Sequence, residues 1–189
     1  MSMEKFKGRE TEQPKKHESL EGFPNPLEAI EILQNSLEIS PTIHDNIAIC
    51  VIKPDAFVHR DAIVERLKES GLYIVKRTDL VLPENFVVNE MYGGDHLPKQ
   101  IAEATRRHFL SGPSEIILVK GDNLLAKLLQ TVGLKTNPAL CDPETVRFMY
   151  GDHVPEDLDE GLQYYKNAAH RGTTPAEIEA DLQKFRNIL

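Results

Sequence analysis

The apolar run at residues 46–52 is the feature that most restricts the fold of this 189-residue chain. It carries Ile47, Ile49, Val51 and Ile52, so apolar side chains fall on both faces of an extended strand. Such a run predicts a strand that is buried on both faces. The strand ends at Lys53, which it delivers to the edge of this buried region.

The remaining hydrophobic patterns alternate between helical and extended periods. We predict helices over 61–70, 84–92, 98–110, 123–132 and 175–189, and strands over 72–82 and 115–120. A long polar segment, 134–166, follows the fourth helix, and a strand or loop carries His170 before the last helix. This order is typical of an α+β sandwich with an antiparallel sheet.

The chain is expected to form one domain, at 45–189, behind a flexible extension at 1–44. The first 25 residues are polar and offer too little apolar surface to offset the entropy of ordering. Within the extension, residues at about 26–38 repeat apolar side chains at helical spacing, which predicts a short amphipathic helix.

The charge and cysteine content exclude several classes of protein. A net charge of −8 argues against nonspecific binding to nucleic acid or to anionic membranes, whereas a small anionic substrate remains compatible. No stretch approaches the roughly 20 apolar residues that span a bilayer. Cys50 and Cys141 are too few for a disulfide framework. We expect a cytoplasmic protein.

His170 stands in the segment Asn167-Ala168-Ala169-His170, four residues before a helix-start signal. Thr174, Pro175 and Glu177 provide an N-cap hydroxyl, a proline at the first helical position and a capping-box glutamate. The free N–H groups of that helix end are expected near His170, where they would favour negative charge on or beside the ring. A phosphohistidine would suit this position.

Three separated motifs accompany this histidine: Ile52-Lys53-Pro54-Asp55-Ala56, then Lys135-Thr136-Asn137-Pro138-Ala139, then Asn167-Ala168-Ala169-His170. Arg147 follows Thr136 by 11 residues, and Ser111-Gly112-Pro113 precedes the strand at 115–120. Together, and in this order, these motifs resemble those of nucleoside diphosphate kinases. The resemblance covers about 46–189.

The resemblance implies a ferredoxin-like βαββαβ fold, with a four-stranded antiparallel sheet and helices packed on it. It implies ping-pong transfer of the γ-phosphate between nucleoside tri- and diphosphates, with His170 as the nucleophile that becomes phosphohistidine. Lys53 and Arg147 would supply positive charge to the phosphates, and Thr136 a hydrogen bond.

By the same resemblance, Asn167 would contact the ribose together with Lys53, and Mg²⁺ would bridge the phosphates. Tyr92 falls near the active-site tyrosine of the family, although a tyrosine at the end of an amphipathic helix suits a core equally well. Asp181 falls where the family has a glutamate that orients the histidine, with Glu177 and Glu179 as neighbouring alternatives. The base would be held by packing alone, so base specificity should be loose.

The chain also departs from the family pattern. The second phosphate-binding arginine falls on Gln130, and Arg171-Gly172-Thr173 replaces the usual small residue, serine and aspartate. The aromatic that stacks on the base has no clear counterpart in 96–109. An acidic insertion of ten residues lies within 152–165, in a loop that helps build the family's oligomer. A homo-oligomer is therefore left open here.

Two further functions compete with the kinase. A nucleotide-binding or protein-interaction module with little or no activity would explain Gln130 and the altered segment after His170. A phosphohistidine that donates to a protein is equally compatible with the motifs. Taken singly, Thr136-Asn137-Pro138 is only a turn signal and Arg147 a loop charge. Retention of Asn167 and His170 at this spacing favours the phosphotransferase.

Overall fold

A computed structural model describes residues 46–92, 97–186 and 188. The expected extension at 1–44, its helix at about 26–38, the break at Gly93–Asp95 and the apolar Leu189 all lie outside the described residues. The elements follow one another as the sequence predicts, with strand, helix, strand and helices before the third strand. The bounds are β1 Ile47–Ile52, α2 Arg60–Glu69, β2 Tyr73–Leu80, α3 Lys99–Phe109, β3 Ser114–Lys120, α4 Leu124–Val132, α5 Val146–Tyr150, β4 Glu156–Asp157, β5 Gln163–Tyr164, β6 Ala169–Arg171 and α6 Pro175–Phe185.

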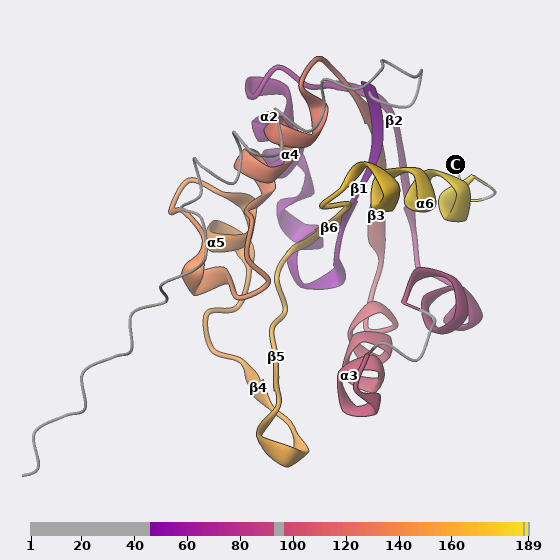
Figure 1. The fold of residues 1–189 in the computed structure, drawn as a ribbon, viewed down its shortest axis with the longest axis vertical. Helices are drawn as coiled ribbons and strands as arrows, with labels where there is room; N and C mark the ends of the chain where they lie inside the picture. The colour runs from indigo at the N-terminus through magenta and orange to yellow at the C-terminus, as the bar shows by residue number, and fades with distance from the viewer. Residues whose placement is uncertain (1–45, 93–96, 187, 189) are drawn as a thin grey trace, which may run out of the picture.

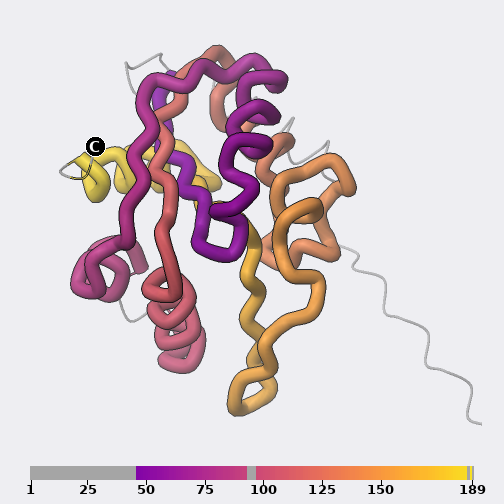
Figure 2. The backbone as a smooth tube through the Cα atoms, turned by 180° about the vertical axis from the view of Figure 1, so that it is seen from behind, coloured from indigo at the N-terminus to yellow at the C-terminus, as the bar shows by residue number. Residues whose placement is uncertain are grey.

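The main sheet has the strand order β2-β3-β1-β6, and each neighbouring pair is antiparallel. Figure 1 shows α2 and α4 grouped together, away from α6. Seen from behind, β2 runs beside β3, and the β4–β5 hairpin extends from the opposite half of the domain (Figure 2). The expected α+β, ferredoxin-like fold with a four-stranded antiparallel sheet is confirmed.

The central strand β1 contributes to two hydrophobic cores, one on each face of the sheet. Its side chains alternate between faces. Ala48, Cys50 and Ile52 enter a core that they share with α2 and α4, whereas Ile49 and Val51 enter a second core with Phe109 and Phe185. All five are 0–1% exposed, as the apolar run predicts. The strand therefore delivers whatever follows Ile52 into the interior.

The helix expected at 84–92 is confirmed, and its main part, Phe86–Met91, is π-helical. One expectation about secondary structure is corrected. The segment 134–166, expected to be a long polar loop, contains a 3₁₀ turn at Pro138–Leu140, the short helix α5, and the β4–β5 hairpin. Elements of two to five residues carry no hydrophobic period long enough to be seen in a sequence.

The last helix begins where the capping signal predicts. The Oγ1 of Thr174 accepts a hydrogen bond from the backbone N–H of Glu177 at 3.2 Å. The Glu177 carboxylate closes back on the N–H of Thr173 at 2.7 Å, one residue before the N-cap. Ile178 and Phe185 are buried, and Leu182 packs against both cores. In the described part of the chain, no helix is both long and apolar enough to cross a membrane.

Candidate functional site

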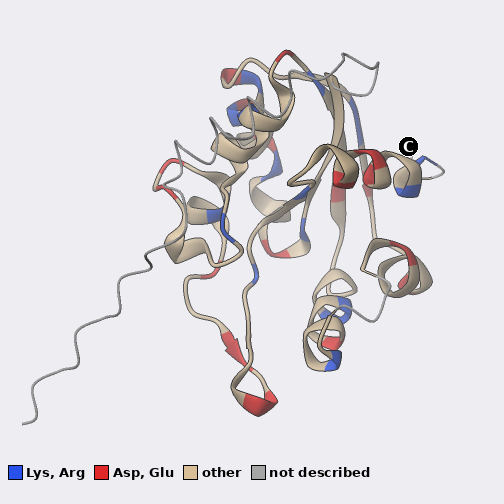
Figure 3. Ribbon diagram, in the orientation of Figure 1, with Lys and Arg blue, Asp and Glu red and all other residues tan. Residues whose placement is uncertain are grey.

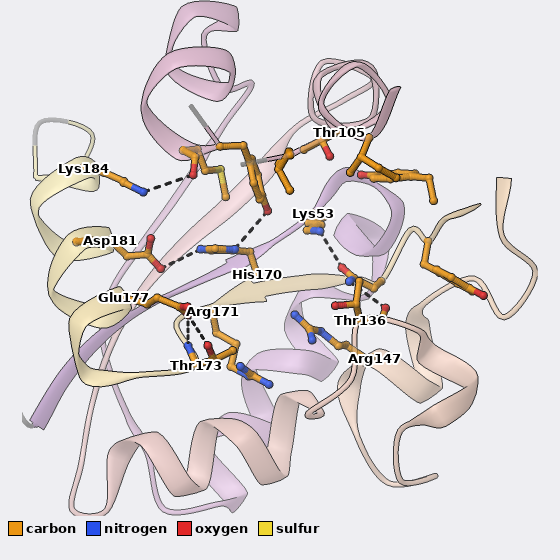
Figure 4. A pocket seen from close by; sticks show the side chains of 18 of the residues that line it. Lys53, Thr105, Thr136, Arg147, His170, Arg171, Thr173, Glu177, Asp181 and Lys184 are labelled. Atoms are coloured by element: carbon orange, nitrogen blue, oxygen red, sulfur yellow. Dashed lines mark hydrogen bonds and ion pairs between the residues drawn. The ribbon is translucent and has the colours of Figure 1, made fainter. Parts of the chain in front are cut away.

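A pocket of about 510 Å³ opens where β6, α6, α3 and the loops after β1 and α4 meet (Figure 4). All six site residues expected from the sequence line this pocket. They are Lys53, Tyr92, Thr136, Arg147, Asn167 and His170. The fold therefore brings together side chains that the sequence separates by up to 117 positions.

His170 is held from both ring nitrogens. Its Nε2 lies 2.9 Å from Oδ2 of Asp181 in α6, and its Nδ1 lies 3.3 Å from the hydroxyl of Tyr92. Burial lowers the pKa of His170, against the opposing effect of the Asp181 carboxylate. Because this pKa lies below its ordinary value of 6.5, the ring is neutral near pH 7. The hydrogen bond to a carboxylate places its proton on Nε2, so the lone pair is on Nδ1.

The expectation that the free N–H groups at the start of α6 lie near His170 is partly corrected. Thr173 and Glu177, at the start of α6, line the same pocket. However, the imidazole contacts Asp181 in the second turn of the helix, rather than the free N–H groups at its end. Asp181, which is 4% exposed, is thus the carboxylate that meets the ring, and the alternatives Glu177 and Glu179 are exposed.

The backbone leading to His170 is strained and tightly held. Ala168 has a φ of 63°, in the left-handed region that residues other than glycine rarely occupy. Its N–H donates to Oδ2 of Asp55 at 2.9 Å, and its carbonyl accepts from the N–H of Lys53 at 2.8 Å. Although burial alone would raise the pKa of Asp55, hydrogen bonding from His108 and nearby positive charge lower it. Asp55 is therefore an anionic anchor for the turn before His170.

Lys53 follows β1 directly and is only 6% exposed. Its Nζ donates to Oδ1 of Asn167 at 2.7 Å, and the Asn167 amide in turn donates to the carbonyl of Thr136 at 3.1 Å. Burial and the positive charge of Arg147 lower the pKa of Lys53 to about 7. This amine bears a charge that the protein interior disfavours, and an anion in the pocket would stabilise it.

Arg147 is also buried, at 7% exposure. Its guanidinium donates to three backbone carbonyls, those of Gly133, Lys135 and Ala169, at 3.0 to 3.4 Å. Burial lowers its pKa. Among the described residues, no carboxylate lies within ion-pair distance of this guanidinium. Its positive charge is solvated by dipoles alone and remains available to an anion.

The Thr136-Asn137-Pro138 motif has two separate tasks. Asn137 is structural, since its Oδ1 accepts the N–H of Ala139 at 3.0 Å and caps the turn at Pro138–Leu140. Thr136 is exposed at the pocket. Gln130, which the sequence suggested in the place of a second phosphate-binding arginine, is exposed on α4 and is not among the pocket residues. This position of α4 therefore contributes no cation to the pocket.

Sequence reasoning missed one wall of the pocket. Tyr164 and Tyr165, at the base of the β4–β5 hairpin, line the pocket together with Leu97, Ile101 and Thr105, which lie in α3 or just before it. The described residues of α3 that line the pocket, Ile101 and Thr105, are not aromatic, whereas the two tyrosines come from the segment taken for an insertion. The Tyr164 hydroxyl lies 2.9 Å from Nδ1 of His108, which ties the hairpin to α3. The adjacent tyrosines were the available signal, but nothing in the sequence indicated which loop they would reach.

The charge around the pocket differs from that of the whole protein. Four cations line it, Lys53, Arg147, Arg171 and Lys184, against two carboxylates, Glu177 and Asp181. The acidic residues of the insertion lie instead on the β4–β5 hairpin, where Figure 3 shows red at the tip. A chain with a net charge of −8 thus concentrates positive charge at one pocket, which favours a small anionic ligand.

Comparison with known proteins identifies a matching family and several relatives. The model of one protein family, described as nucleoside diphosphate kinase, matches residues 46–187. A nucleoside diphosphate kinase of Archaeoglobus fulgidus is 30% identical over 138 residues, covering 71% of this chain and 82% of the relative. A thioredoxin domain-containing protein 3 homolog of Ciona intestinalis is 28% identical over 158 residues, covering 80% of this chain but only 21% of that protein.

A solved structure has a similar fold. It is described as a transition state mimic of nucleoside-diphosphate kinase from Borrelia burgdorferi with bound vanadate and ADP. The TM-score is 0.64 at 18% identity, and the match covers 74% of this chain and 85% of that one. At this identity the likeness bears on the fold, and the chemistry of the pocket rests on the residues described above.

Proposed function

The chain belongs to the nucleoside diphosphate kinase family, and we propose that it moves the γ-phosphate of a nucleoside triphosphate to a nucleoside diphosphate through a phosphohistidine on His170. One observation carries this proposal. The His170 ring is fixed by Asp181 at Nε2 and is neutral, while its Nδ1 faces a pocket lined by buried cations. In this arrangement a nucleophile lies beside groups that suit a phosphate.

In the first half-reaction, Nδ1 of His170 attacks the γ-phosphorus. A bond forms between Nδ1 and phosphorus, and the bond from phosphorus to the bridging oxygen breaks, so the nucleoside diphosphate leaves with the electron pair. The ring then carries positive charge, which the Asp181 carboxylate stabilises through the Nε2 proton. The second half-reaction reverses these steps with another nucleoside diphosphate.

The buried cations would stabilise the negative charge of the transition state. Negative charge spreads over the equatorial oxygens during phosphoryl transfer, and preformed donors at those oxygens lower the barrier. Lys53 and Arg147 line the pocket with His170, and Thr136 lies exposed at its rim. Tyr92, whose hydroxyl already meets Nδ1, would release this contact as phosphorus approaches.

Asn167 and Lys53 would also meet the ribose hydroxyls. Lys53 donates to Oδ1 of Asn167 at 2.7 Å. An ammonium has three N–H donors and a side-chain amide has two, so each group retains a donor for the ligand. Leu97, Ile101 and the two tyrosines also line the pocket. Such walls hold a base by packing, which supports the expected loose base specificity.

Mg²⁺ is proposed to enter with the nucleotide. Within the described ranges, no group of three His, Cys, Asp or Glu side chains gathers in a way that could hold a metal ion. Magnesium commonly binds nucleotides through phosphate oxygens and water. It would neutralise part of the phosphate charge, and the chain's own residues do the rest. A cytoplasmic location and a homo-oligomer stay predictions from the sequence.

The experiment that tests this function is transfer of label from γ-labelled ATP with Mg²⁺ to the protein, followed by a chase with unlabelled GDP. Wild type should acquire acid-labile label and pass it to GDP, whereas His170→Ala should acquire none. A matched control is His153→Ala, which removes an exposed histidine outside the pocket. Labelling that persists in His170→Ala would contradict the assignment.

A nucleotide-binding module without transfer is the second candidate, and the position of Gln130 favours it. A pocket without a cation from position 130 would bind a nucleotide yet stabilise the transition state less well. Labelling and ADP binding, measured on the same samples, distinguish the two functions. Binding of ADP without any label on wild type would replace the kinase by the binding module.

A further inference from the structure

Arg171 follows His170 in β6, and its side chain therefore leaves the strand on the other side. It pairs with Cys50, on the face that packs against α4, while His170 pairs with Val51. Arg171 is 2% exposed and yet lines the same pocket. Figure 4 shows Arg171 and Arg147 together below the His170 ring.

The guanidinium of Arg171 is incompletely satisfied by the protein. Nη2 donates to the carbonyl of Gly133, and Nη1 to that of Gly172 at 3.3 Å. Nε is buried and has no hydrogen-bond partner among the described residues. A guanidinium carries five N–H donors, so a buried edge is left over. Leaving such a donor unpaired in the interior is unfavourable.

The charge of Arg171 is also uncompensated. In the described chain it forms no ion pair, and its neighbour Arg147, which shares the Gly133 carbonyl, forms none either. Burial and the charge of Arg147 lower the pKa of Arg171 to about 9. The opposing effects of Cys50, Cys141 and Glu177 on this pKa are smaller, and the Glu177 carboxylate already accepts from the N–H and hydroxyl of Thr173.

Two buried guanidinium groups side by side destabilise each other unless an anion joins them. A phosphate group is the fitting anion, because guanidinium binds phosphate through two parallel N–H donors. We propose that Arg171 is a phosphate-binding residue of this pocket, which acts with Arg147 on the terminal phosphates of the nucleotide. This rests on the proposed function for the ligand class. It also explains how the pocket holds two arginines although Gln130 lies outside it.

A purely structural role is the competing explanation, since Arg171 bonds to Gly133 at the end of α4 and would stabilise that helix terminus. The two roles differ in how they depend on the number of phosphates. An arginine that binds phosphate strengthens the binding of ADP but not of adenosine. An arginine that only caps the helix affects the binding of both molecules alike.

The test is calorimetric binding of ADP and of adenosine to wild type, Arg171→Gln and Arg171→Lys. Arg171→Gln should lower the affinity for ADP at least about tenfold and the affinity for adenosine by less than about twofold. Arg171→Lys should recover part of the lost affinity for ADP. Arg186→Gln is the matched control, because Arg186 is exposed and outside the pocket. Equal losses for both ligands, or no loss for either, would overturn the proposal.

A second measurement uses wild type alone and so does not depend on the folding of a variant. Inorganic pyrophosphate is added while the Nε–H resonance of Arg171 is followed by NMR. The resonance should shift and its exchange with solvent should slow, and an unchanged signal at saturating pyrophosphate would overturn the proposal. Both measurements report binding, so they stand even if no phosphohistidine forms. Failure of the kinase function is therefore distinguishable from failure of this one.

Discussion

Replacement of Lys53 by methionine should change how the stability of the protein depends on pH. The amine is 6% exposed, and its pKa falls from 10.5 to about 7 because burial and Arg147 disfavour the charged form. In the unfolded chain the amine stays protonated up to about pH 10.5. Between these two values the unfolded state binds one more proton than the folded state, so stability rises with pH.

The size of the effect follows from the displacement of the pKa. Each pH unit between about 7 and 10.5 should add roughly 1.4 kcal/mol to the free energy of unfolding of wild type, relative to Lys53→Met. Over the whole interval this amounts to about 5 kcal/mol. Below about pH 7 the amine is charged in both states, the full penalty of burying it is present, and the difference between the two proteins becomes constant.

The assay is urea unfolding of both proteins by circular dichroism at about pH 7 and about pH 9, where the free energy difference should change by about 2 to 3 kcal/mol. Lys120→Met, at an exposed position in β3, controls for removal of a lysine outside the pocket. Bound ADP should reduce the pH dependence, because phosphate stabilises the charged amine. Parallel pH profiles for wild type and Lys53→Met without nucleotide would refute the reasoning.

Two other predictions concern the support of His170 and of the arginines. Asp181→Asn should lower the rate of phosphohistidine formation by roughly tenfold or more, because the amide stabilises the positively charged ring less well, whereas Glu179→Gln on the exposed face of α6 should leave the rate unchanged in single-turnover labelling. Gly133→Ala should lower the free energy of unfolding by about 1 to 3 kcal/mol in urea titrations, because Gly133 has a φ of 107° and an added Cβ would lie 3.0 Å from Cys141 Sγ. An Asp181→Asn rate equal to wild type, or an unchanged midpoint for Gly133→Ala, would contradict the corresponding assignment.

The parts of the fold that the sequence predicted are those with a long hydrophobic period. The run at 46–52 and the helix at 123–132 each bury several apolar side chains, and both appear with nearly the expected bounds. The β4–β5 hairpin could not be predicted in this way, since each of its strands has two residues and their burial depends on distant partners such as His108.

The candidate site was predictable where motif and backbone agree. Lys53 and His170 lie at strand ends or inside strands, so their relative positions follow from the register of β1 and β6. Gln130 and Arg171 were harder, because their roles depend on side-chain direction. Gln130 lies on the exposed face of α4, and Arg171 turns inward beside Arg147. Spacing in a sequence does not encode that direction.

The central claim is that Nδ1 of His170 is the nucleophile, because Asp181 occupies Nε2. The direct measurement is NMR of protein labelled with ¹⁵N at histidine, after reaction with ATP and Mg²⁺, which identifies the ring nitrogen that carries phosphorus. We predict phosphate on Nδ1 of His170 and its loss on addition of GDP. Phosphate on Nε2, or on another residue while His170 stays unmodified, would contradict the account.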